Sequence, residues 1–433
     1  MPTPAGADLI VVGGGVIGTA IAWRAALAGR AVTLIDPGTD DKASLVAAGM
    51  LGPVSESVFG EQDLLNLNLH AVDRFPSFNA ELEAASGHRT GLRTEGTLAV
   101  AYDNDDLAAL DRLTEFRHSI GLAAQRLSAR ECRRLEPFLA PSTRGGVLAT
   151  GDLSVDNRRY LAALRAAAAR AGVRAIAGYV TDVVDAVSGR VGVRVAASGG
   201  EDPRPALPPV TGGADEEEEE EETIVEEVAA ELSAASVVIA AGWATGRING
   251  IPDEIRKAIR PVKGQLLRLR HPKNLPPIAT HTIRAIVGGR DIYLVPREDG
   301  ELVVGATQEE RGDRDVTAGA VHDLLRDAVT ALPAIGELTL AEASAGLRPG
   351  TSDNGPILGR VGTVSPSGTV SPSGTVGPSG NGDPASAEGI IIAAGHFRNG
   401  ILLSAATADA VAALLAGQAP HQAWTPFRPG RLG

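Results

Sequence analysis

Residues 8–36, DLIVVGGGVIGTAIAWRAALAGRAVTLID, constrain the fold of this chain more than any other stretch. Residues 9–12 are a short apolar run, as a buried parallel strand requires, and three glycines end it. An Ala-rich helix follows from about Val16, and residues 31–35 form a second apolar strand that ends at Asp36. The order of strand, glycine turn, helix and strand predicts a βαβ unit of the Rossmann type.

The glycine turn has the spacing of a dinucleotide-binding site. Gly13, Gly15 and Gly18 match GxGxxG: the first makes the tight turn, the second lets the backbone approach a pyrophosphate, and the third permits close helix–strand packing. The following helix N-terminus faces the phosphates with free N–H groups. Asp36 stands where a carboxylate accepts hydrogen bonds from an adenosine ribose. Glycines, helix and acid in this order favour a bound dinucleotide over a glycine-rich turn without a ligand.

Length and composition limit the class of protein. A chain of 433 residues exceeds one ordinary core, so we expect two or three domains. Aromatic residues make up only 3%, and the cores must therefore be aliphatic. The formal charge of −13 argues against a nucleic-acid or anionic-membrane partner, although a run of acids at 215–222 supplies part of it. No apolar stretch is long enough to read as a membrane span.

The single cysteine, Cys132, excludes an internal disulfide framework and fits a reducing compartment. Ser128 and Glu131 predict a capping box on a short helix around it, and we interpret Cys132 as a structural thiol. The N-terminus lacks the basic segment of a signal peptide. We therefore expect a cytoplasmic protein.

After Asp36 the chain departs from a nicotinamide dehydrogenase, because a loop of small residues replaces the next βα unit. Residues 61–86 then predict a helix interrupted near Pro76. Residues 145–149, a helix from about Asp156 and residues 173–177 predict a second βαβ unit.

Two further blocks complete the pattern. Residues 180–187 and 191–197 alternate like a hairpin of exposed strands. Beyond Arg260 strands alternate with turns, and Thr317 is placed to cap a long amphipathic helix. A strand-rich block inserted between Rossmann-like pieces predicts a substrate domain.

Two segments have low complexity. Residues 198–222 are Pro, Gly and acid without periodicity, which predicts a disordered insertion because such a segment buries too little apolar surface. The repeats GTVSPS, GTVSPS and GTVGPS at 362–379 are too few for a solenoid, and we expect a hairpin extension.

At this point the sequence resembles FAD-dependent oxidases of the D-amino acid oxidase family, and within it the glycine oxidases of thiamine biosynthesis. The matching motifs run almost the whole length of the chain: GGGVIG at 13–18, AAGMLGP at 47–53, RPVKGQ at 260–265, YLVPR at 293–297, VVGAT at 303–307, AGLRPGT at 345–351 and AAGHFRNGILL at 393–403. Several motifs in order are far more specific than one alone.

The resemblance implies non-covalent FAD in an extended conformation, with its adenosine at Asp36. Tyr293 and Arg348 would hold the substrate carboxylate, and Arg398 would lie beside the flavin. A planar guanidinium suits a carboxylate better than an ammonium does. The cofactor-binding residues implied are Gly13, Gly15, Val16, Ile17, Gly18, Asp36, Ala48, Gly49, Met50, Val180, Gly242, His396, Arg398, Asn399, Gly400 and Ile401.

Physical reasoning supports one of these placements and limits others. A helix that begins after Asn399 would turn its positive dipole end towards the flavin edge that becomes negative on reduction. We interpret His396 as structural rather than as a base. Nothing near Lys263 marks a pyridoxal site, and no metal site is predicted. Glycine oxidases often carry methionine where this chain has Gln308, which leaves substrate size and polarity open.

The fold class expected is α/β, a discontinuous Rossmann-like FAD-binding domain with an α+β substrate domain on a mainly antiparallel sheet. The FAD-binding domain would comprise 1–88, 145–258 and 341–433, and the substrate domain 89–144 and 259–340. The function expected is oxidation of glycine or a similar small amino acid with oxygen as acceptor, in a homo-oligomer. A D-amino acid dehydrogenase, a sarcosine-type oxidase and a non-catalytic FAD-binding protein stay open as alternatives. The last would have no reason to keep Tyr293, Arg348 and Arg398.

Overall fold

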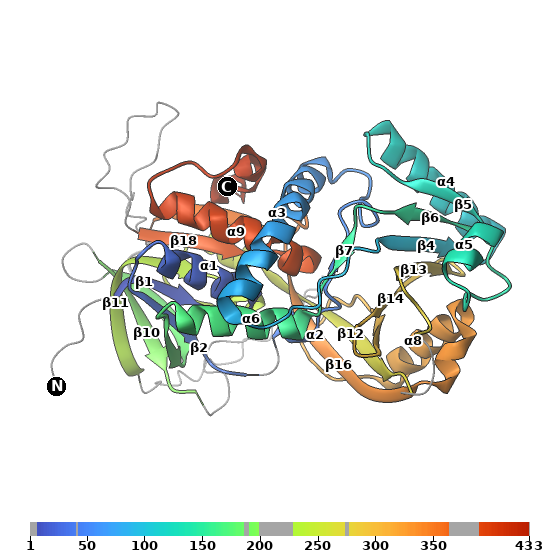
Figure 1. The fold of residues 1–433 in the computed structure, drawn as a ribbon. Helices are drawn as coiled ribbons and strands as arrows, with labels where there is room; N and C mark the ends of the chain where they lie inside the picture. The colour runs from blue at the N-terminus through green and yellow to red at the C-terminus, as the bar shows by residue number, and fades with distance from the viewer. Residues whose placement is uncertain are drawn as a thin grey trace, which may run out of the picture.

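The structure is a computed structural model that describes residues 7–39, 42–185, 190–198, 228–272, 277–362 and 389–432. Two eight-stranded sheets lie in separate lobes (Figure 1). A short antiparallel pair is formed by β3 (Met50–Leu51) and β7 (Leu153–Ser154). The acidic run and nearly all of the hexapeptide repeat lie outside the described residues, so the expectations for both insertions stay predictions.

The first sheet is the expected Rossmann-like sheet. Its main path has the order β17-β18-β11-β1-β2-β8, and β1 runs parallel to both of its neighbours. Residues 9–12 of β1 are buried, as a strand covered on both faces requires. The strands of this path are β1 (Ala7–Val12), β2 (Val32–Asp36), β8 (Arg174–Ala177), β11 (Val228–Ile239), β17 (Ile357–Val361) and β18 (Gly389–Ala394).

The predicted hairpin joins this sheet but is not exposed. β9 (Tyr179–Asp185) pairs antiparallel with β10 (Val191–Ala196), and β10 pairs with β11. Most residues of both strands are buried, because their valines pack in one cluster with Ile10, Val12 and Ile239 of the central strands. The expectation of exposed strands was wrong. Alternating apolar and polar residues indicate that the two faces of a strand differ, but they do not indicate which other elements pack against each face.

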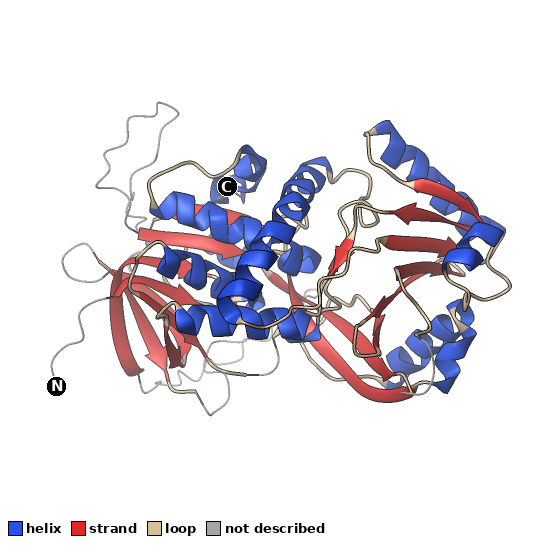
Figure 2. Cartoon of the chain, viewed as in Figure 1, coloured by secondary structure: helices blue, strands red, loops and turns tan. Residues whose placement is uncertain are grey.

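Helices cover the other face of the first sheet (Figure 2). They are α1 (Val16–Leu27), α3 (Gln62–Ser86), α6 (Asn157–Arg170) and α9 (Gly400–Leu415). The predicted interruption near Pro76 is absent, since α3 continues through it. Phe75 and Phe78 on either side of the proline are fully buried, and Phe78 meets Trp23 edge to face at 5.2 Å. This packing offsets the cost of about 3 kcal/mol that proline imposes inside a helix.

The second sheet has the order β16-β12-β15-β14-β13-β4-β6-β5. All neighbours are antiparallel except β13 and β4, so the expected, mainly antiparallel substrate sheet is confirmed. Its strands are β4 (Thr97–Ala101), β5 (Gln125–Ser128), β6 (Gly145–Ala149), β12 (Arg260–Arg270), β13 (Thr282–Val287), β14 (Arg290–Pro296), β15 (Glu301–Gly305) and β16 (Thr339–Gly350).

Three longer helices accompany this sheet: α4 (Asn104–Ser119), α5 (Ala129–Leu135) and α8 (Ala318–Ala331). Thr317 caps α8 as predicted, since its Oγ1 accepts a hydrogen bond from the Ala320 N–H at 3.3 Å. The capping box of Ser128 and Glu131 is also present at the start of α5. Cys132 on α5 is fully buried, and burial raises the pKa of its thiol to about 11, as expected of a structural thiol.

The second βαβ unit predicted over residues 145–177 does not exist. β6 pairs antiparallel with β4 and β5 in the second sheet, whereas β8 pairs parallel with β2 in the first. β16 likewise pairs along its whole length with β12 of the second sheet. Both β6 and most of β16 fall within ranges that the proposed domain division gave to the FAD-binding domain. Strand pairing is a long-range property, which the local order of strand and helix does not determine.

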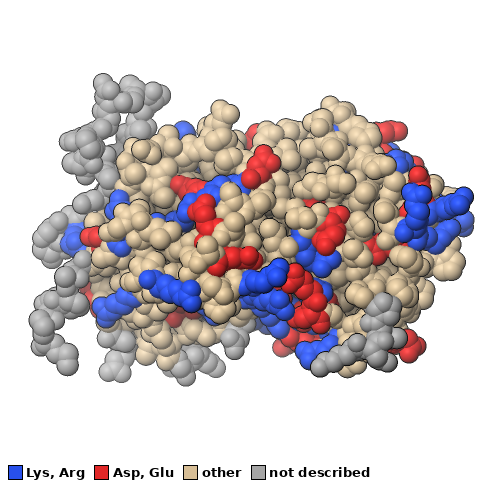
Figure 3. Space-filling model, viewed as in Figure 1, with Lys and Arg blue, Asp and Glu red and all other residues tan. Residues whose placement is uncertain are grey.

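The remaining elements are short. They are α2 (Ala43–Val46), α7 (Asp253–Ala258) and the 3₁₀ helices η2 (Gly242–Arg247), η3 (Pro333–Glu337), η5 (Phe397–Asn399), η6 (Gln422–Phe427) and η7 (Pro429–Leu432). Within the described ranges, no helix combines the length and apolar character needed to cross a membrane. Basic and acidic side chains are interspersed over the face drawn in Figure 3.

Candidate active site

One cavity of about 960 Å³ collects residues from both sheets. Its lining begins at the turn between β1 and α1, passes Asp36, and reaches Tyr293 and Arg348 of the second sheet. This volume lies at the upper end of the range of about 300–1,000 Å³ for small-molecule sites. Of the catalytic and cofactor-binding residues expected from the sequence, all but Gly18 and Asn399 line it.

The glycine turn is built as the motif requires. Gly13 has a φ of +107°, and a Cβ there would lie 2.4 Å from the Ala240 carbonyl oxygen. A Cβ on Gly18 would lie 1.9 Å from the Gly13 carbonyl oxygen, so Gly18 serves helix–strand packing behind the cavity. Gly15 itself lines the cavity. The turn therefore exposes backbone to a ligand where a side chain would obstruct it.

Asp36 is held at the rim of this turn by three donors. Its carboxylate accepts from the Gly14 N–H at 2.6 Å and from the Gly38 N–H at 2.9 Å, and the Lys42 ammonium lies 3.0 Å away. A carboxylate has about four acceptor positions, so one stays free for a ribose hydroxyl. Lys42 was not identified from the sequence, and only its place just after the Asp36 strand could have suggested it.

The segment 42–50 runs along the cavity, from the end near Asp36 towards the residues of the second sheet. The Ser44 hydroxyl accepts a hydrogen bond from the Val16 N–H at 3.1 Å and lies next to Gly15. Ala48, Gly49 and Met50 line the cavity further along. Sequence reasoning found these three but missed Ser44, whose neighbours in the sequence carry no phosphate-binding pattern.

The N-terminus of α9 also opens on the cavity. Gly400 and Ile401 line it, as does Arg398 from η5. Asn399 precedes the helix, is buried, and does not line the cavity. His396 lines the cavity and is buried: its Nε2 lies 3.0 Å from the Thr407 Oγ1, and burial lowers its pKa to about 3. It is neutral at physiological pH, which agrees with a structural role.

Tyr293 and Arg348 reach the cavity over two glycines. A Cβ on Gly305 would lie 2.5 Å from the Tyr293 hydroxyl oxygen, and one on Gly264 would lie 2.3 Å from the Arg348 Nη1. Arg348 Nη1 donates to the Thr307 carbonyl oxygen at 3.2 Å. Both side chains therefore lie flat on the second sheet in positions that only glycine beneath them permits.

The charges around these two groups favour an anion. Burial raises the pKa of Tyr293, opposed by the neighbouring Arg348 guanidinium, so the phenol keeps its proton. Within the described part of the chain, Arg348 bonds to the Lys263 and Thr307 carbonyl oxygens and to the Tyr293 side chain, which are all neutral groups. Arg398, in contrast, is paired with Glu61 at 2.5 Å. Of these two guanidinium groups, that of Arg348 has no carboxylate partner among the described residues.

A second group of polar residues at this end was missed in the sequence. Arg284, the cross-strand neighbour of Tyr293, forms an ion pair with Glu56 at 3.0 Å. Arg117 of α4 is buried, donates to the Ser55 carbonyl oxygen at 2.7 Å, and has its pKa lowered to about 10 by burial. All three line the cavity. No motif contains them, and they come together only in the tertiary structure.

Three other residues considered in the sequence are now placed. Gln308 lines the cavity, so its polar side chain bears on what the cavity accepts. Lys263 is fully buried, ion-paired with Asp313 and does not line the cavity. Cys132 lies in the core of the second sheet and not on the cavity.

Comparison with known proteins identifies the family. The model of the family described as FAD dependent oxidoreductase (DAO) matches residues 8–414. The chain belongs to this family. The glycine oxidase of Geobacillus kaustophilus is 31% identical over 411 residues, which cover 94% of this chain and 92% of that protein. The crystal structure of glycine oxidase from Geobacillus kaustophilus aligns with a TM-score of 0.76 at 30% identity, over 98% of both chains.

A bifunctional relative is similar over part of its length. The protein ThiO/ThiG of Trichormus variabilis is 27% identical over 412 residues, which cover 95% of this chain and 53% of that protein. The expected family, fold class and FAD dependence are confirmed. The cavity fits this cofactor, because its Gly13–Gly15 turn, the free acceptor position of Asp36 and the two helix N-termini supply what a dinucleotide needs.

Proposed function

We propose that this member of the FAD dependent oxidoreductase family oxidises glycine or a similarly small amino acid. The observation that carries the proposal is the convergence of Tyr293 and Arg348 on one wall of the cavity that holds the dinucleotide turn. The reaction takes a hydride from the α-carbon and a proton from the amine, and leaves an imine that water converts to a 2-oxo acid and ammonia. FAD held by the residues above would supply the acceptor for this hydride and the means by which oxygen is reduced to hydrogen peroxide.

Arg348 and Tyr293 would bind and orient the substrate carboxylate. The guanidinium offers two parallel N–H donors, and the protonated phenol offers a third donor. Because Arg348 is already held by the Thr307 carbonyl oxygen, substrate binding costs little ordering of its side chain. Fixing the carboxylate leaves the α-carbon hydrogen pointing in one direction, which is the main task of the protein in such a reaction.

Arg398 and the N-terminus of α9 would lie at the flavin. The ion pair of Arg398 with Glu61 neutralises its charge, so we assign it to the flavin side rather than to the carboxylate. The positive end of α9 at Gly400 would favour negative charge that develops on the cofactor. The residues proposed to hold FAD are otherwise those expected from the sequence, without Gly18 and Asn399 as direct contacts and with the addition of Ser44.

Gln308 leaves the preferred amine to experiment. Its polar side chain on the cavity wall offers a hydrogen-bonding partner to a substrate substituent. The sequence resemblance also leads us to propose non-covalent FAD, a homo-oligomer in the cytoplasm and a place in thiamine biosynthesis. The division into FAD-binding and substrate domains is proposed along the two sheets.

The deciding experiment is anaerobic mixing of the FAD-loaded protein with glycine, sarcosine, D-alanine and D-proline while the flavin absorbance is recorded. Bleaching by glycine and its recovery on admission of air support the proposal. Bleaching by D-alanine or D-proline alone, without recovery in air, would identify a dehydrogenase of D-amino acids. A flavin that none of the amines bleaches would indicate a non-catalytic FAD-binding protein.

A further inference from the structure

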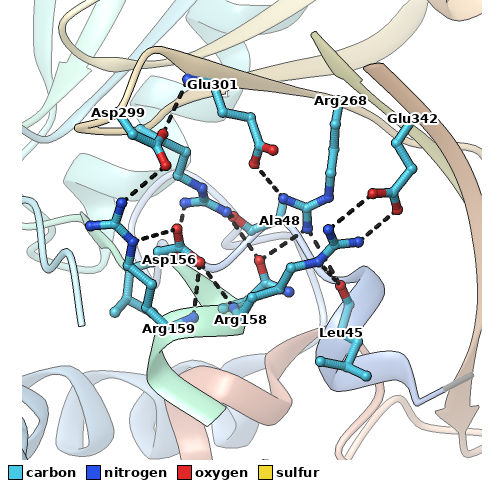
Figure 4. Close-up of polar contacts among 12 residues, drawn as sticks. Leu45, Ala48, Asp156, Arg158, Arg159, Arg268, Asp299, Glu301 and Glu342 are labelled. Atoms are coloured by element: carbon cyan, nitrogen blue, oxygen red, sulfur yellow. Dashed lines mark hydrogen bonds and ion pairs between the residues drawn. The ribbon is translucent and has the colours of Figure 1, made fainter. Parts of the chain in front are cut away.

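Two buried arginines and a half-buried one bond to the segment 42–50 and do not line the cavity; Figure 4 shows the polar contacts around them. Arg297 follows β14 and Arg268 belongs to β12, so both come from the second sheet. Asn157 and Arg158 begin α6 of the first lobe. None of these four residues lines the cavity, so none has a place in the proposed function.

Arg297 binds the backbone just before Gly49 and the backbone of the segment that faces it. Its Nη2 donates to the Ala48 carbonyl oxygen at 2.5 Å, and its Nη1 donates to the Val155 carbonyl oxygen at 2.8 Å. The Val155 N–H in turn donates to the Gly49 carbonyl oxygen at 2.9 Å. Gly49 has a φ of +77°, and a Cβ there would lie 2.0 Å from the Val155 carbonyl oxygen. The guanidinium thus joins two chain segments at their closest approach.

The neighbours of Arg297 hold the earlier part of the same segment. Asn157 Oδ1 accepts from Arg297 at 3.3 Å and from Arg268 at 3.2 Å, and its Nδ2 donates to the Ser44 carbonyl oxygen at 2.8 Å. Arg158 Nε donates to the Leu45 carbonyl oxygen at 3.1 Å. The carbonyl oxygens at 44, 45 and 48 are therefore bound from behind, while the other side of the segment lines the cavity.

Burying the Arg297 guanidinium at this place is unfavourable in free energy. Its side chain is buried, and burial lowers its pKa to about 10. Its hydrogen bonds within the described chain go to neutral oxygens rather than to a carboxylate. Burying a cation without a directly bonded anion costs free energy that a neutral side chain would avoid. What the guanidinium provides in exchange is the hydrogen bonds that tie the Ala48 backbone to Val155.

We propose that Arg297 is a positioning residue for the flavin, which acts by fixing the backbone of Ala48, Gly49 and Met50. The proposal rests on the placement of the flavin end at these three residues, as proposed above. Its consequence is that a side chain from the second sheet, outside the cavity, controls how firmly and in what position the cofactor is held. FAD binding and the docking of the two lobes are then linked through one guanidinium.

The test compares Arg297→Met with Arg159→Met in the full-length protein. Arg159 belongs to the same cluster, where it bonds to Asp299 at 3.0 Å, but it does not contact the segment 42–50. FAD affinity is measured by titration of the apoprotein, and the absorption spectrum of bound flavin is recorded at saturating FAD. Far-UV circular dichroism of each apoprotein checks that it is folded.

We expect Arg297→Met to raise the Kd for FAD by about tenfold or more, which is about 1.4 kcal/mol. At saturation its flavin spectrum should shift towards that of free FAD, which a loss of stability alone would not produce. Arg159→Met should match the parent in both measurements. A Kd and a spectrum of Arg297→Met equal to those of Arg159→Met overturn the proposal.

A second variant covers the case in which Arg297→Met does not fold. Arg297→Lys keeps the charge but reaches only one of the two carbonyl oxygens, so a smaller rise in Kd and a smaller spectral shift are expected. Parent-like values for Arg297→Lys would then refute the proposal. The proposed function fails on a different result, a parent enzyme whose flavin no amine bleaches, and that result leaves the comparison of FAD affinities intact.

Discussion

Replacement of Arg348 tests the assignment of the substrate carboxylate. The guanidinium lies flat over Gly264 and is oriented by the Thr307 carbonyl oxygen at 3.2 Å, so it is pre-formed for binding. Two charge-assisted hydrogen bonds to a carboxylate are worth about 1.5–3 kcal/mol each. Loss of both in Arg348→Ala should lower kcat/KM for glycine by a factor of about 10² to 10⁴, at about 1.4 kcal/mol per factor of ten.

The lysine variant separates charge from geometry. Arg348→Lys keeps the positive charge but loses the planar fork, so we expect a large rise in KM and a smaller loss in kcat/KM than in the alanine variant. The flavin spectrum should stay that of the parent in both variants. Arg270→Ala, which removes an exposed arginine at the end of β12, serves as the matched control and should keep parent kinetics.

The assay is oxygen consumption at varied glycine concentration, repeated with a simple amine that lacks the carboxylate. The simple amine should react about equally poorly with the parent and with Arg348→Ala, because it forms no bond with the guanidinium. If Arg348→Ala oxidised glycine with the KM and kcat of the parent, the carboxylate site would lie elsewhere, and Arg398 would become the next candidate. Loss of FAD from Arg348→Ala would equally contradict a role confined to the substrate.

Three further outcomes are expected. Asp36→Ala should weaken FAD retention about tenfold or more in dialysis and titration. The substitution removes the acceptor of a ribose hydrogen bond worth about 1.5–3 kcal/mol and leaves the Gly14 N–H without its acceptor. Undiminished retention would refute the ribose assignment. His396 has a folded pKa of about 3 against 6.5 when unfolded, so below pH 6.5 only the unfolded chain takes up the proton, and stability should fall by about 1.4 kcal/mol per pH unit down to about pH 3. Urea denaturation of the FAD-saturated parent and of His396→Gln checks this, because the difference between their free energies of unfolding isolates the contribution of His396 and should have that slope. Deletion of 201–222, or replacement of 363–383 by a Gly-Asn turn, should change the melting temperature little. The flanking strands β10 with β11 and β17 with β18 are already paired, and loop-closure entropy varies slowly with length. Loss of FAD binding in either variant would show that the segment contributes to the fold.

Local signals in the sequence were enough for the dinucleotide turn. The glycines at 13, 15 and 18 and the acid at 36 lie within one βαβ unit, where the backbone conformation depends on neighbours in the chain. The caps at Ser128 and Thr317 were predictable for the same reason, since a cap bonds to N–H groups three residues away. The family resemblance added Tyr293 and Arg348, whose motifs place them on strands.

Only the tertiary structure decided which strands share a sheet and which side chains meet. β6 and β8 are separated in the sequence only by the short strand β7 and the helix α6, yet they lie in different sheets, because strand pairing is settled by burial across the whole molecule. α3 continues through Pro76 because its buried phenylalanines pack on Trp23. The ion pair of Arg398 with Glu61 and the hold of Arg297 on Ala48 join residues hundreds of positions apart. Such contacts form only when folding brings distant segments together, and no local pattern in a single sequence indicates which segments will meet.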